Sequence, residues 1–394
     1  MSKTLRTAAC LLAAAVAVTA GTSAAAADDR TDNHAGLQRV LEQAVTQERM
    51  PGIIAEVRNG GEKWFSTEGV ADTKTERKRR QQDRFRVGSV TKSFTGTVVL
   101  QLVGEGKLSL DDTVEKWLPG VVSGNGYDPA KITIRMLLNQ NSGLFPYTSD
   151  KTMATRYFTR AFPEHRFDAY RPADLVKFAV ANPPTSAPGV AWMYSNTNYT
   201  VAGLIIEKVT GNSLAQEVER RIIRPLRLTA TYIPGNDTRI RGPHAQNYST
   251  RYAVADPNPD APIINSTDMN VSWGYGAGNM VSTTGDLQTF YKALLGGKLL
   301  PPSVQQEMYK TVSTKAVPWI ENTDYGLGIF SQTLSCGVVA WGNGGFIHGS
   351  WTYAMGSKDG RHMVVTNVNG DWGDPVKNIF TKELEAEMCP PSSK

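Results

Sequence analysis

The chain has 394 residues, with 42 Lys and Arg against 37 Asp and Glu, and its formal net charge is +5. A positive charge this weak and dispersed excludes a nucleic-acid-binding face, so no nucleic-acid partner is predicted. Hydrophobic residues make up 40% and charged residues 20% of the chain. This globular composition excludes disorder or a coiled coil as a description of the whole protein.

The first 27 residues have the pattern of a secretory signal peptide. Lys3 and Arg6 precede an apolar run over residues 8–20, which leads to Ala25-Ala26-Ala27. The run is shorter than the roughly 20 residues that a bilayer span needs, so a retained membrane anchor is the weaker alternative. We therefore expect a secreted, extracellular protein without a stable membrane anchor. Removing the first 27 residues leaves 367 and lowers the net charge to +3.

The mature chain would keep two cysteines, Cys336 and Cys389. In an oxidising compartment one disulfide between them is the economical prediction, and two buried free thiols are the alternative. No CxxC and no Cys/His cluster offers a zinc site. Residues 256–260 open like a calcium loop but lack the Gly and Glu that such a loop requires. No metal and no cofactor are predicted.

The elements at the start of the chain are a helix and a hairpin. Apolar spacing predicts a helix over 33–48, and alternating residues predict strands over 53–57 and 63–66 around the turn Asn59-Gly60-Gly61. A charged loop is expected over 73–83. Helices joined by Pro- and Gly-rich connections then follow over 89–105, 111–117, 133–140, 172–181, 198–209 and 214–222.

The last third of the chain returns to strands. After a Gly-rich passage at 274–278 and a helix over 284–295, strands are predicted over 326–334, 338–341, 352–356 and 363–368, with a closing helix over 375–388. Because strands lie at both ends, we expect one α/β unit over 28–394. Its antiparallel sheet lobe (28–86 and 281–394), flanked by the terminal helices, would carry an inserted all-α lobe (87–280). A monomer with a ligand cleft between the lobes is expected.

The sharpest chemical candidate is Ser89-Val90-Thr91-Lys92, at the start of the helix predicted over 89–105. A serine there lies beside exposed backbone N–H groups that favour developing negative charge. Lys92 is one helical turn further on the same face. If it is buried, its pKa falls and the neutral amine can take the Ser89 proton. Alone, the pattern is more simply a capping serine with a surface lysine.

A second element, Tyr194-Ser195-Asn196, precedes the helix predicted over 198–209. Tyr194 beside a lysine could act as a phenolate-type base or as a proton relay. Asn196 could hold both the lysine and a substrate carbonyl through its two-sided amide. By itself the tripeptide indicates an ordinary loop, and it becomes informative because the Ser89 motif lies about a hundred residues upstream.

With both elements present, the chain resembles the penicillin-recognising serine enzymes. Within them it is most similar to secreted D-alanyl-D-alanine carboxypeptidases of actinomycete type and to class C β-lactamases. The resemblance covers nearly the whole mature chain and is carried by these runs of residues: 83–94 (DRFRVGSVTKSF), 106–111 (GKLSLD), 132–138 (ITIRMLL) leading to 142–144 (SGL), 194–199 (YSNTNY) and 325–328 (YGLG).

The resemblance implies a β-lactamase/transpeptidase-like fold with Ser89 at the junction of the two lobes. Ser89 would be the nucleophile, Lys92 its activating partner and Tyr194 the proton relay to the leaving group. The backbone N–H groups of Ser89 and of the strand near Thr352 would form the oxyanion hole. The substrates that it implies are D-amino-acid peptides, peptidoglycan-type stems and β-lactams.

The chain departs from this family where a cation and a hydroxyl normally meet the substrate carboxylate. The family's His/Lys-Thr/Ser-Gly triplet aligns with Asn343-Gly344-Gly345, and an Arg-rich turn of the carboxypeptidases is Phe330-Ser331-Gln332. An unpaired buried carboxylate would cost several kcal/mol. Either His348 or an arginine supplies the charge, or the substrate has no free carboxylate at this point.

Two further residues, Trp273 and His348, can each be interpreted in two ways. Trp273, beside the Gly-rich passage, is either an aromatic wall of the substrate pocket or a core residue, and His348 is either a site residue or a structural histidine. D-alanyl-D-alanine carboxypeptidase is the best single functional prediction. A D-stereospecific amidase or peptidase, an esterase or a β-lactamase are alternatives within the family. A binding or sensing protein for peptidoglycan fragments or β-lactams is the alternative from another class.

Overall fold

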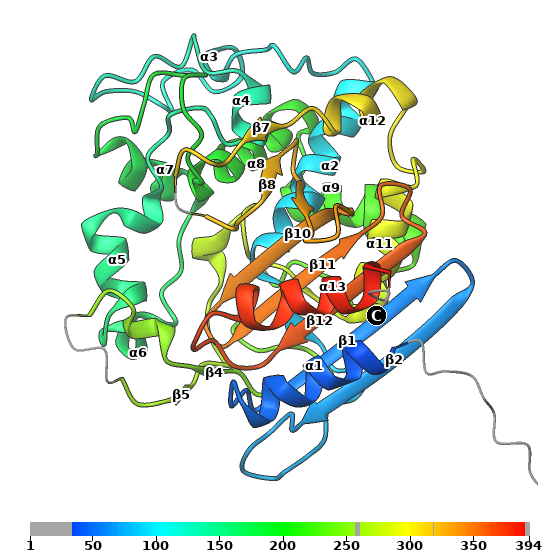
Figure 1. Cartoon of the computed structure of the whole chain (residues 1–394). Coiled ribbons are helices and arrows are strands. Elements are labelled where there is room, and N and C mark those ends of the chain that lie inside the picture. The colour runs from blue at the N-terminus through cyan, green and yellow to red at the C-terminus, as the bar shows by residue number, and fades with distance from the viewer. Residues whose placement is uncertain (1–33, 257–260, 318, 391–394) are drawn as a thin grey trace, which may run out of the picture. The chain divides into compact units, whose positions relative to one another are not determined.

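The computed structural model describes residues 34–256, 261–317 and 319–390 (Figure 1). The expected signal peptide and residues 257–260 of the calcium-like turn lie outside this part. His34 begins one compact unit of the chain. No helix in the described part is both long and apolar enough to cross a membrane. The same residues contain no cluster of three or more His, Cys, Asp or Glu side chains arranged to hold a metal ion.

A large antiparallel sheet organises the described chain. Its strand order is β2-β1-β12-β11-β10-β9-β8-β7, so the N-terminal hairpin lies beside the C-terminal strand, with Ile53 opposite Val368. This confirms the predicted antiparallel sheet formed by the two ends of the chain. The strands are β1 (Gly52–Asn59), β2 (Glu62–Gly69), β7 (Val312–Ser313), β8 (Thr323–Tyr325), β9 (Phe330–Thr333), β10 (Val339–Ile347), β11 (Ser350–Gly356) and β12 (His362–Val368).

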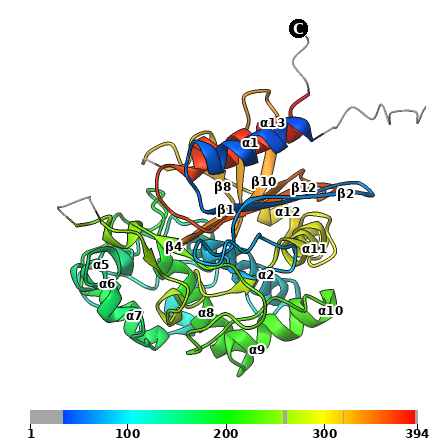
Figure 2. The same cartoon turned by 90° about the horizontal axis from the view of Figure 1, so that it is seen from below.

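Helices cover both faces of the sheet (Figure 2). On one face lie the terminal helices α1 (Ala35–Thr46) and α13 (Thr381–Met388), with the π-helical turn η6 (Val376–Phe380). On the other face α11 (Thr284–Leu295) packs on β1 and β12, and α2 (Thr91–Gly104) packs on β10. The central strands are therefore buried on both faces, and two apolar cores form, one on each side of the sheet.

The helical region is inserted between β2 and the rest of the sheet. A short ladder of β3 (Phe85–Arg86) with β6 (Val281–Ser282) stands where the chain enters and leaves it. The insertion contains α3 (Val114–Trp117), α4 (Ile134–Leu138), α5 (Lys151–Phe158), α6 (Phe162–His165), α7 (Pro172–Val180), α8 (Asn196–Thr210), α9 (Leu214–Val218), a π turn (Glu219–Ile223) and α10 (Arg224–Leu226).

Several elements differ from the sequence prediction. Helices α5, α6 and α12 (Pro302–Met308) were not predicted. The strand expected over 326–334 is shorter, β9, and β8 before it was not predicted. Strand β10 continues to Ile347, although Gly344 and Gly345 have poor strand propensity. Residues 343–347 are held instead by pairing with β11, a contact that local sequence does not specify.

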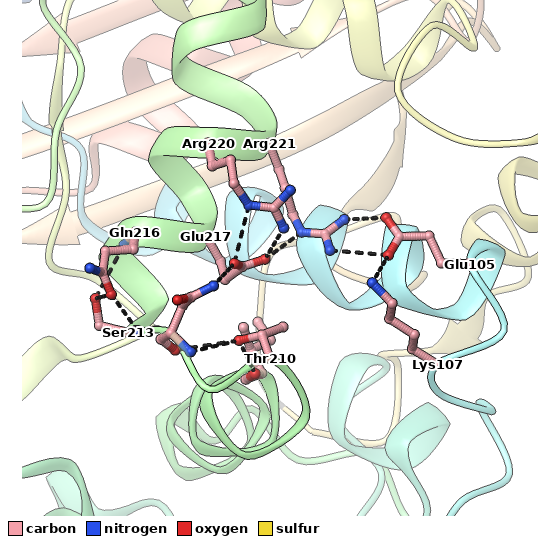
Figure 3. Close-up of polar contacts among 10 residues, drawn as sticks. Glu105, Lys107, Thr210, Ser213, Gln216, Glu217, Arg220 and Arg221 are labelled. Atoms are coloured by element: carbon pink, nitrogen blue, oxygen red, sulfur yellow. Dashed lines mark hydrogen bonds and ion pairs between the residues drawn. The ribbon is translucent and has the colours of Figure 1, made fainter.

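Helix α2 is tied to α9 at its C-terminal end (Figure 3). The buried Glu217 accepts hydrogen bonds from Arg220 and Arg221, and Arg221 also bridges to Glu105, the residue after α2. Ser213 and Gln216 form a capping box that starts α9. These contacts attach the C-terminal end of α2 to α9 and the turn that follows it.

Candidate active site

Ser89 lies in the 3₁₀ turn η1 (Gly88–Val90) that leads into α2. Two glycines let strand β10 pass this turn backbone against backbone. Gly88 has φ +52°, and a Cβ on it would lie 2.5 Å from Phe346 O, whereas a Cβ on Gly345 would lie 2.6 Å from Ser89 N. A side chain at either position would push the strand away from Ser89.

Lys92 stands one turn further along α2 and is 0% exposed. Its Nζ lies 3.0 Å from Ser89 Oγ, 2.7 Å from Asn196 Oδ1 and 2.8 Å from Ala277 O. No carboxylate among the described residues forms an ion pair with it. The structure thus brings Ser89, Lys92 and Asn196 together as the motifs predicted.

Burial lowers the pKa of the Lys92 ammonium well below its ordinary value. A neutral amine has two N–H groups and one lone pair. Asn196 Oδ1 and Ala277 O can accept only, so they use the two N–H groups, and the lone pair is left for the Ser89 hydroxyl. The three contacts therefore suit the neutral form of Lys92, which is the form that can remove the Ser89 proton.

Tyr194 also contacts Ser89 and lies beside Lys92. Its hydroxyl donates to Ser89 Oγ at 2.7 Å, and burial raises the pKa of the phenol well above its ordinary value. The phenol is therefore protonated at neutral pH, which favours the proton-relay interpretation over the phenolate. The ring lies 4.7 Å from Lys92 Nζ and can stabilise that group when it becomes protonated.

Gln140 positions the Tyr194-Ser195-Asn196 segment and was missed by the sequence analysis. Its Oε1 accepts from Ser195 N at 3.0 Å and from Asn198 Nδ2 at 2.6 Å, and its backbone carbonyl accepts from Met193 N. Gln140 lies between the runs 132–138 and 142–144 on which the family resemblance rests, so its place in the chain was the only available signal. Its φ of +69° is unusual for a residue other than glycine.

The triplet Asn343-Gly344-Gly345 lies on β10 beside Ser89. The Asn343 side chain is 2% exposed and donates to Gly328 O at 3.1 Å and to Ser93 Oγ at 3.3 Å. It is thus an uncharged amide turned towards α2. Gly344 offers no hydroxyl, and a Cβ there would lie 2.7 Å from the Tyr353 ring. The structure leaves this position without the cation and the hydroxyl of the related triplets.

A cavity of ≈ 640 Å³ opens around these residues. It follows the part of β10 beyond its pairing with β9, which ends at Gly342. One arm, the helical arm, extends towards Thr148, Phe158 and Trp273. The other, the sheet arm, passes Gly344 to the face covered by η6 and α13, where it is lined by Trp319, Phe330, Gln332, Leu334, Tyr353, Val376, Lys377, Thr381 and Glu385. Ser89, Tyr194 and Asn196 line the same cavity.

Trp273 combines both of its predicted roles, because it lines the cavity and packs in the core. It is 6% exposed and contacts the rings of Tyr157 and Phe158. Trp319, which no sequence signal singled out, stacks on Tyr194 with ring centroids 5.9 Å apart. Tyr194 and Trp319 are 125 positions apart in the sequence, so only the fold reveals their contact.

His348 does not supply the missing charge. It is 0% exposed, its ring stacks on Phe162, and its Nε2 bonds to Tyr157 O at 2.6 Å. Burial lowers the pKa of its imidazole to about 4, so it is neutral at pH 7. It does not line the cavity. The structural interpretation of His348 is therefore the correct one.

Thr352 is also displaced from its predicted place. It lies on β11 opposite Gly345, and its hydroxyl accepts from Asn367 Nδ2 at 3.2 Å. Because β10 runs on to Ile347, it stands between Thr352 and Ser89. A second oxyanion-hole N–H next to Ser89 must therefore come from β10.

The structure joins Cys336 and Cys389 in a disulfide with Cα atoms 5.9 Å apart. The bridge ties the turn between β9 and β10 to the end of α13. Leu334 and Glu385, near its two ends, both line the sheet arm of the cavity. The disulfide therefore holds together two segments that carry residues of this arm.

A model of the beta-lactamase family matches residues 37–385, which is most of the chain. The chain belongs to the beta-lactamase family. The protein is accordingly a serine hydrolase with the beta-lactamase/transpeptidase fold. The constellation of Ser89, Lys92 and Tyr194 lies inside the matched region.

Solved structures of this family resemble the chain over nearly its full length. A D-stereospecific amidohydrolase from Streptomyces sp. is 46% identical with a TM-score of 0.82, covering 90% of this chain and 98% of that one. A D-amino acid amidase from Ochrobactrum anthropi SV3 is 25% identical with a TM-score of 0.77 and the same coverage. Among curated relatives, Protein flp from Staphylococcus aureus (strain MRSA252) is 26% identical over 315 residues. That alignment takes in 77% of this chain but only 59% of the relative's length.

Proposed function

We propose that this beta-lactamase family protein is a D-stereospecific amidohydrolase that is acylated on Ser89 by D-amino-acid amides and esters. The observation that carries the proposal is the uncharged Asn343, whose amide is bonded to Ser93 and Gly328 where related enzymes hold a cation. A substrate without a free carboxylate needs no such cation. The similarity to the Streptomyces amidohydrolase supports the same substrate class.

Acylation uses the Ser89 cluster as a general base and a proton relay. Ser89 Oγ attacks the amide carbonyl carbon while its proton moves to the neutral Lys92 amine. The Ser89 N–H and an N–H of β10 beside Gly345 stabilise the oxyanion. The C–N bond then breaks, and the leaving nitrogen receives the Tyr194 proton, which Lys92 replaces through Ser89 Oγ or directly. The products are a free amine or ammonia and an ester of Ser89.

Deacylation repeats these steps with water as the nucleophile. Water adds to the ester carbonyl and gives its proton to the same cluster, the Ser89 C–O bond breaks, and Ser89 Oγ regains a proton. The second product is the D-amino acid. Asn196, which holds Lys92 Nζ and lines the cavity, can bond the substrate at both steps.

The test compares hydrolysis of D- and L-phenylalanine amide by the purified enzyme. We expect kcat/KM to be about 10²-fold higher for the D-amide, because only the D-enantiomer places its carbonyl between Ser89 and β10. Ser89→Ala should lower the rate by about 10⁴-fold or more and abolish the acyl-enzyme seen by mass spectrometry. Ser123→Ala, at an exposed serine, is the matched control. Equal rates of hydrolysis of the D- and L-amides, or turnover by Ser89→Ala, would contradict the proposal.

D-alanyl-D-alanine carboxypeptidase is the second candidate, because the runs around Ser89 and Tyr194 are most similar to that group. It predicts a higher kcat/KM for a D-Ala-D-Ala peptide than for D-phenylalanine amide. In that case Asn343→His should raise the peptide rate further by supplying a cation. A non-catalytic binding protein would instead release no more than one product per Ser89.

We also propose that the enzyme acts outside the cell. The support is the signal-peptide pattern of residues 1–27. Sequencing the N-terminus of the protein recovered from culture medium tests this. A start near Asp28 is expected, and retention of residues 1–27 on a cell-bound protein would overturn it.

A further inference from the structure

The sheet arm of the cavity extends well beyond Ser89, to residues on η6 and α13. It begins at Gly344, where the absence of a side chain leaves the Tyr353 ring uncovered. Tyr353 stacks on Phe380 and donates its hydroxyl to Gln332 Oε1, so it forms a fixed floor. Phe330 lies 6.0 Å from the Tyr353 ring centroid and forms one wall. Trp319 packs on Phe330 and forms the next.

This arm starts on the side of Ser89 from which the leaving group departs. Tyr194, the proposed proton donor to that group, must face it directly. The Trp319 ring stacks on the Tyr194 ring, so the first surface beyond Tyr194 is the indole. A group leaving from Ser89 past Tyr194 therefore enters the space between Trp319, Phe330 and Tyr353.

The charges around the cavity disfavour an anion in this space. Its lining includes the carboxylates of Glu321, Asp374 and Glu385 but, of the cationic side chains, Lys377 alone. Lys377, Glu321 and Asp374 are all exposed, so water and salt screen them alike, whereas Glu385 is half-buried. Glu385 also accepts from Ser335 N and so remains fixed at the far end. A carboxylate here would meet a net negative field, whereas an aromatic ring would find aromatic walls.

We propose that the sheet arm is a leaving-group subsite for an uncharged aromatic or apolar amine or alcohol. The proposal rests on the proposed function and extends it, because it assigns the other half of the substrate. The helical arm, with Phe158 and Trp273, then receives the D-amino-acid side chain. Gly344, which stands where related triplets have Thr or Ser, thus lies at the start of the aromatic sheet arm.

The experiment keeps D-phenylalanine as the acyl group and changes the leaving group. Four substrates are compared by kcat/KM: the simple amide, the benzylamide, D-Phe-D-Ala with a free carboxylate, and D-Phe-D-Ala amide. We expect the benzylamide to exceed the simple amide by about tenfold or more. We expect D-Phe-D-Ala to be at least about tenfold below its own amide, since the two differ only in the charge.

Trp319 is the residue to vary, because it is only half-buried and lies in a loop. Trp319→Ala should reduce the benzylamide preference by about tenfold. Trp319→Arg should narrow the gap between D-Phe-D-Ala and its amide by a similar factor. Phe158→Ala, a half-buried aromatic residue of the helical arm, is the matched control and should leave both ratios unchanged while lowering all four rates. Ratios within one variant do not depend on its folded fraction.

The outcomes separate the two proposals. If D-phenylalanine amide is not hydrolysed at all, the proposed function fails and the subsite fails with it. If the amide is hydrolysed but D-Phe-D-Ala equals its amide, or the benzylamide preference survives Trp319→Ala, the leaving-group subsite alone is wrong. If Phe158→Ala shifts the ratios as much as Trp319→Ala does, the two arms have been assigned the wrong way round and the proposal is overturned.

Discussion

The two ends of helix α2 bury charged side chains in opposite ways. At the C-terminal end Glu105 and the buried Glu217 share Arg221, and at the N-terminal end Lys92 is buried among neutral acceptors (Figure 3 shows the C-terminal end). Hydrogen bonds from Arg221 lower the pKa of Glu105 to about 2. Burial alone raises the pKa of Glu217, but hydrogen bonds from Arg220 and Arg221 outweigh it and lower this pKa to about 2 as well.

The difference shows what each end is built to do. A paired carboxylate stays ionised across the whole physiological range and holds structure. An unpaired buried lysine loses its charge and becomes a base. A carboxylate with a lowered pKa thus follows the end of α2, and thirteen positions earlier the helix buries an amine whose pKa is also lowered.

The largest expected effect comes from removing the unpaired amine. Lys92→Met should lower kcat/KM for acylation by about 10³–10⁵-fold, because Ser89 then has no base. The free energy of unfolding should change by less than about 2 kcal/mol, since methionine fills a similar volume. Stopped-flow acylation and urea denaturation measure the two. Lys107→Met, at the exposed lysine beyond the other end of α2, is the control. A fully active Lys92→Met enzyme would remove the base from the mechanism.

The second largest effect is expected when Lys92 is given a partner of opposite charge, as Arg221 has at the C-terminal end of α2. Asn196→Asp places a carboxylate on its Nζ and should raise the lysine pKa by about 1–3 units. The reaction needs the neutral amine, so activity is present above this pKa and lost below it. The acid limb of the kcat/KM profile should therefore move to higher pH. Asn196→Ala removes the same contact without adding charge. The acid limb of the Asn196→Ala profile should not move to higher pH. A shift to higher pH as large as that of Asn196→Asp would refute the electrostatic cause.

The smallest effect on catalysis is expected at the paired end. Arg221→Met leaves Glu217 buried with Arg220 as its remaining cation, and it should lower the free energy of unfolding by about 2–3 kcal/mol. Its kcat/KM at 25 °C should stay within about twofold of the parent enzyme. Arg224→Met, which removes an exposed pair with Glu219, should cost less than about 1 kcal/mol. Thermal unfolding of both variants decides this, and a large loss of activity in folded Arg221→Met would mean that the two ends are coupled.

Local sequence predicted most elements that carry a regular apolar pattern. Helix 284–295 and the strands at both ends were found because periodicity reports which face is buried. Helices α5 and α6 were missed since they are short and partly exposed. The extension of β10 through Gly344 and Gly345 was also missed, because that segment is a strand only by virtue of β11 and the Ser89 turn.

From the sequence alone come the prediction of export, the antiparallel sheet formed by the two ends of the chain, and the candidate reacting groups Ser89, Lys92, Tyr194 and Asn196. These follow from short spacings and from resemblance across ordered motifs. Only the tertiary structure decided that Lys92 has neutral acceptors, that His348 is enclosed by aromatic rings, and that Trp319 continues the site beyond Tyr194. Burial and contacts between distant segments set these properties, and neither is written in any local stretch of the chain.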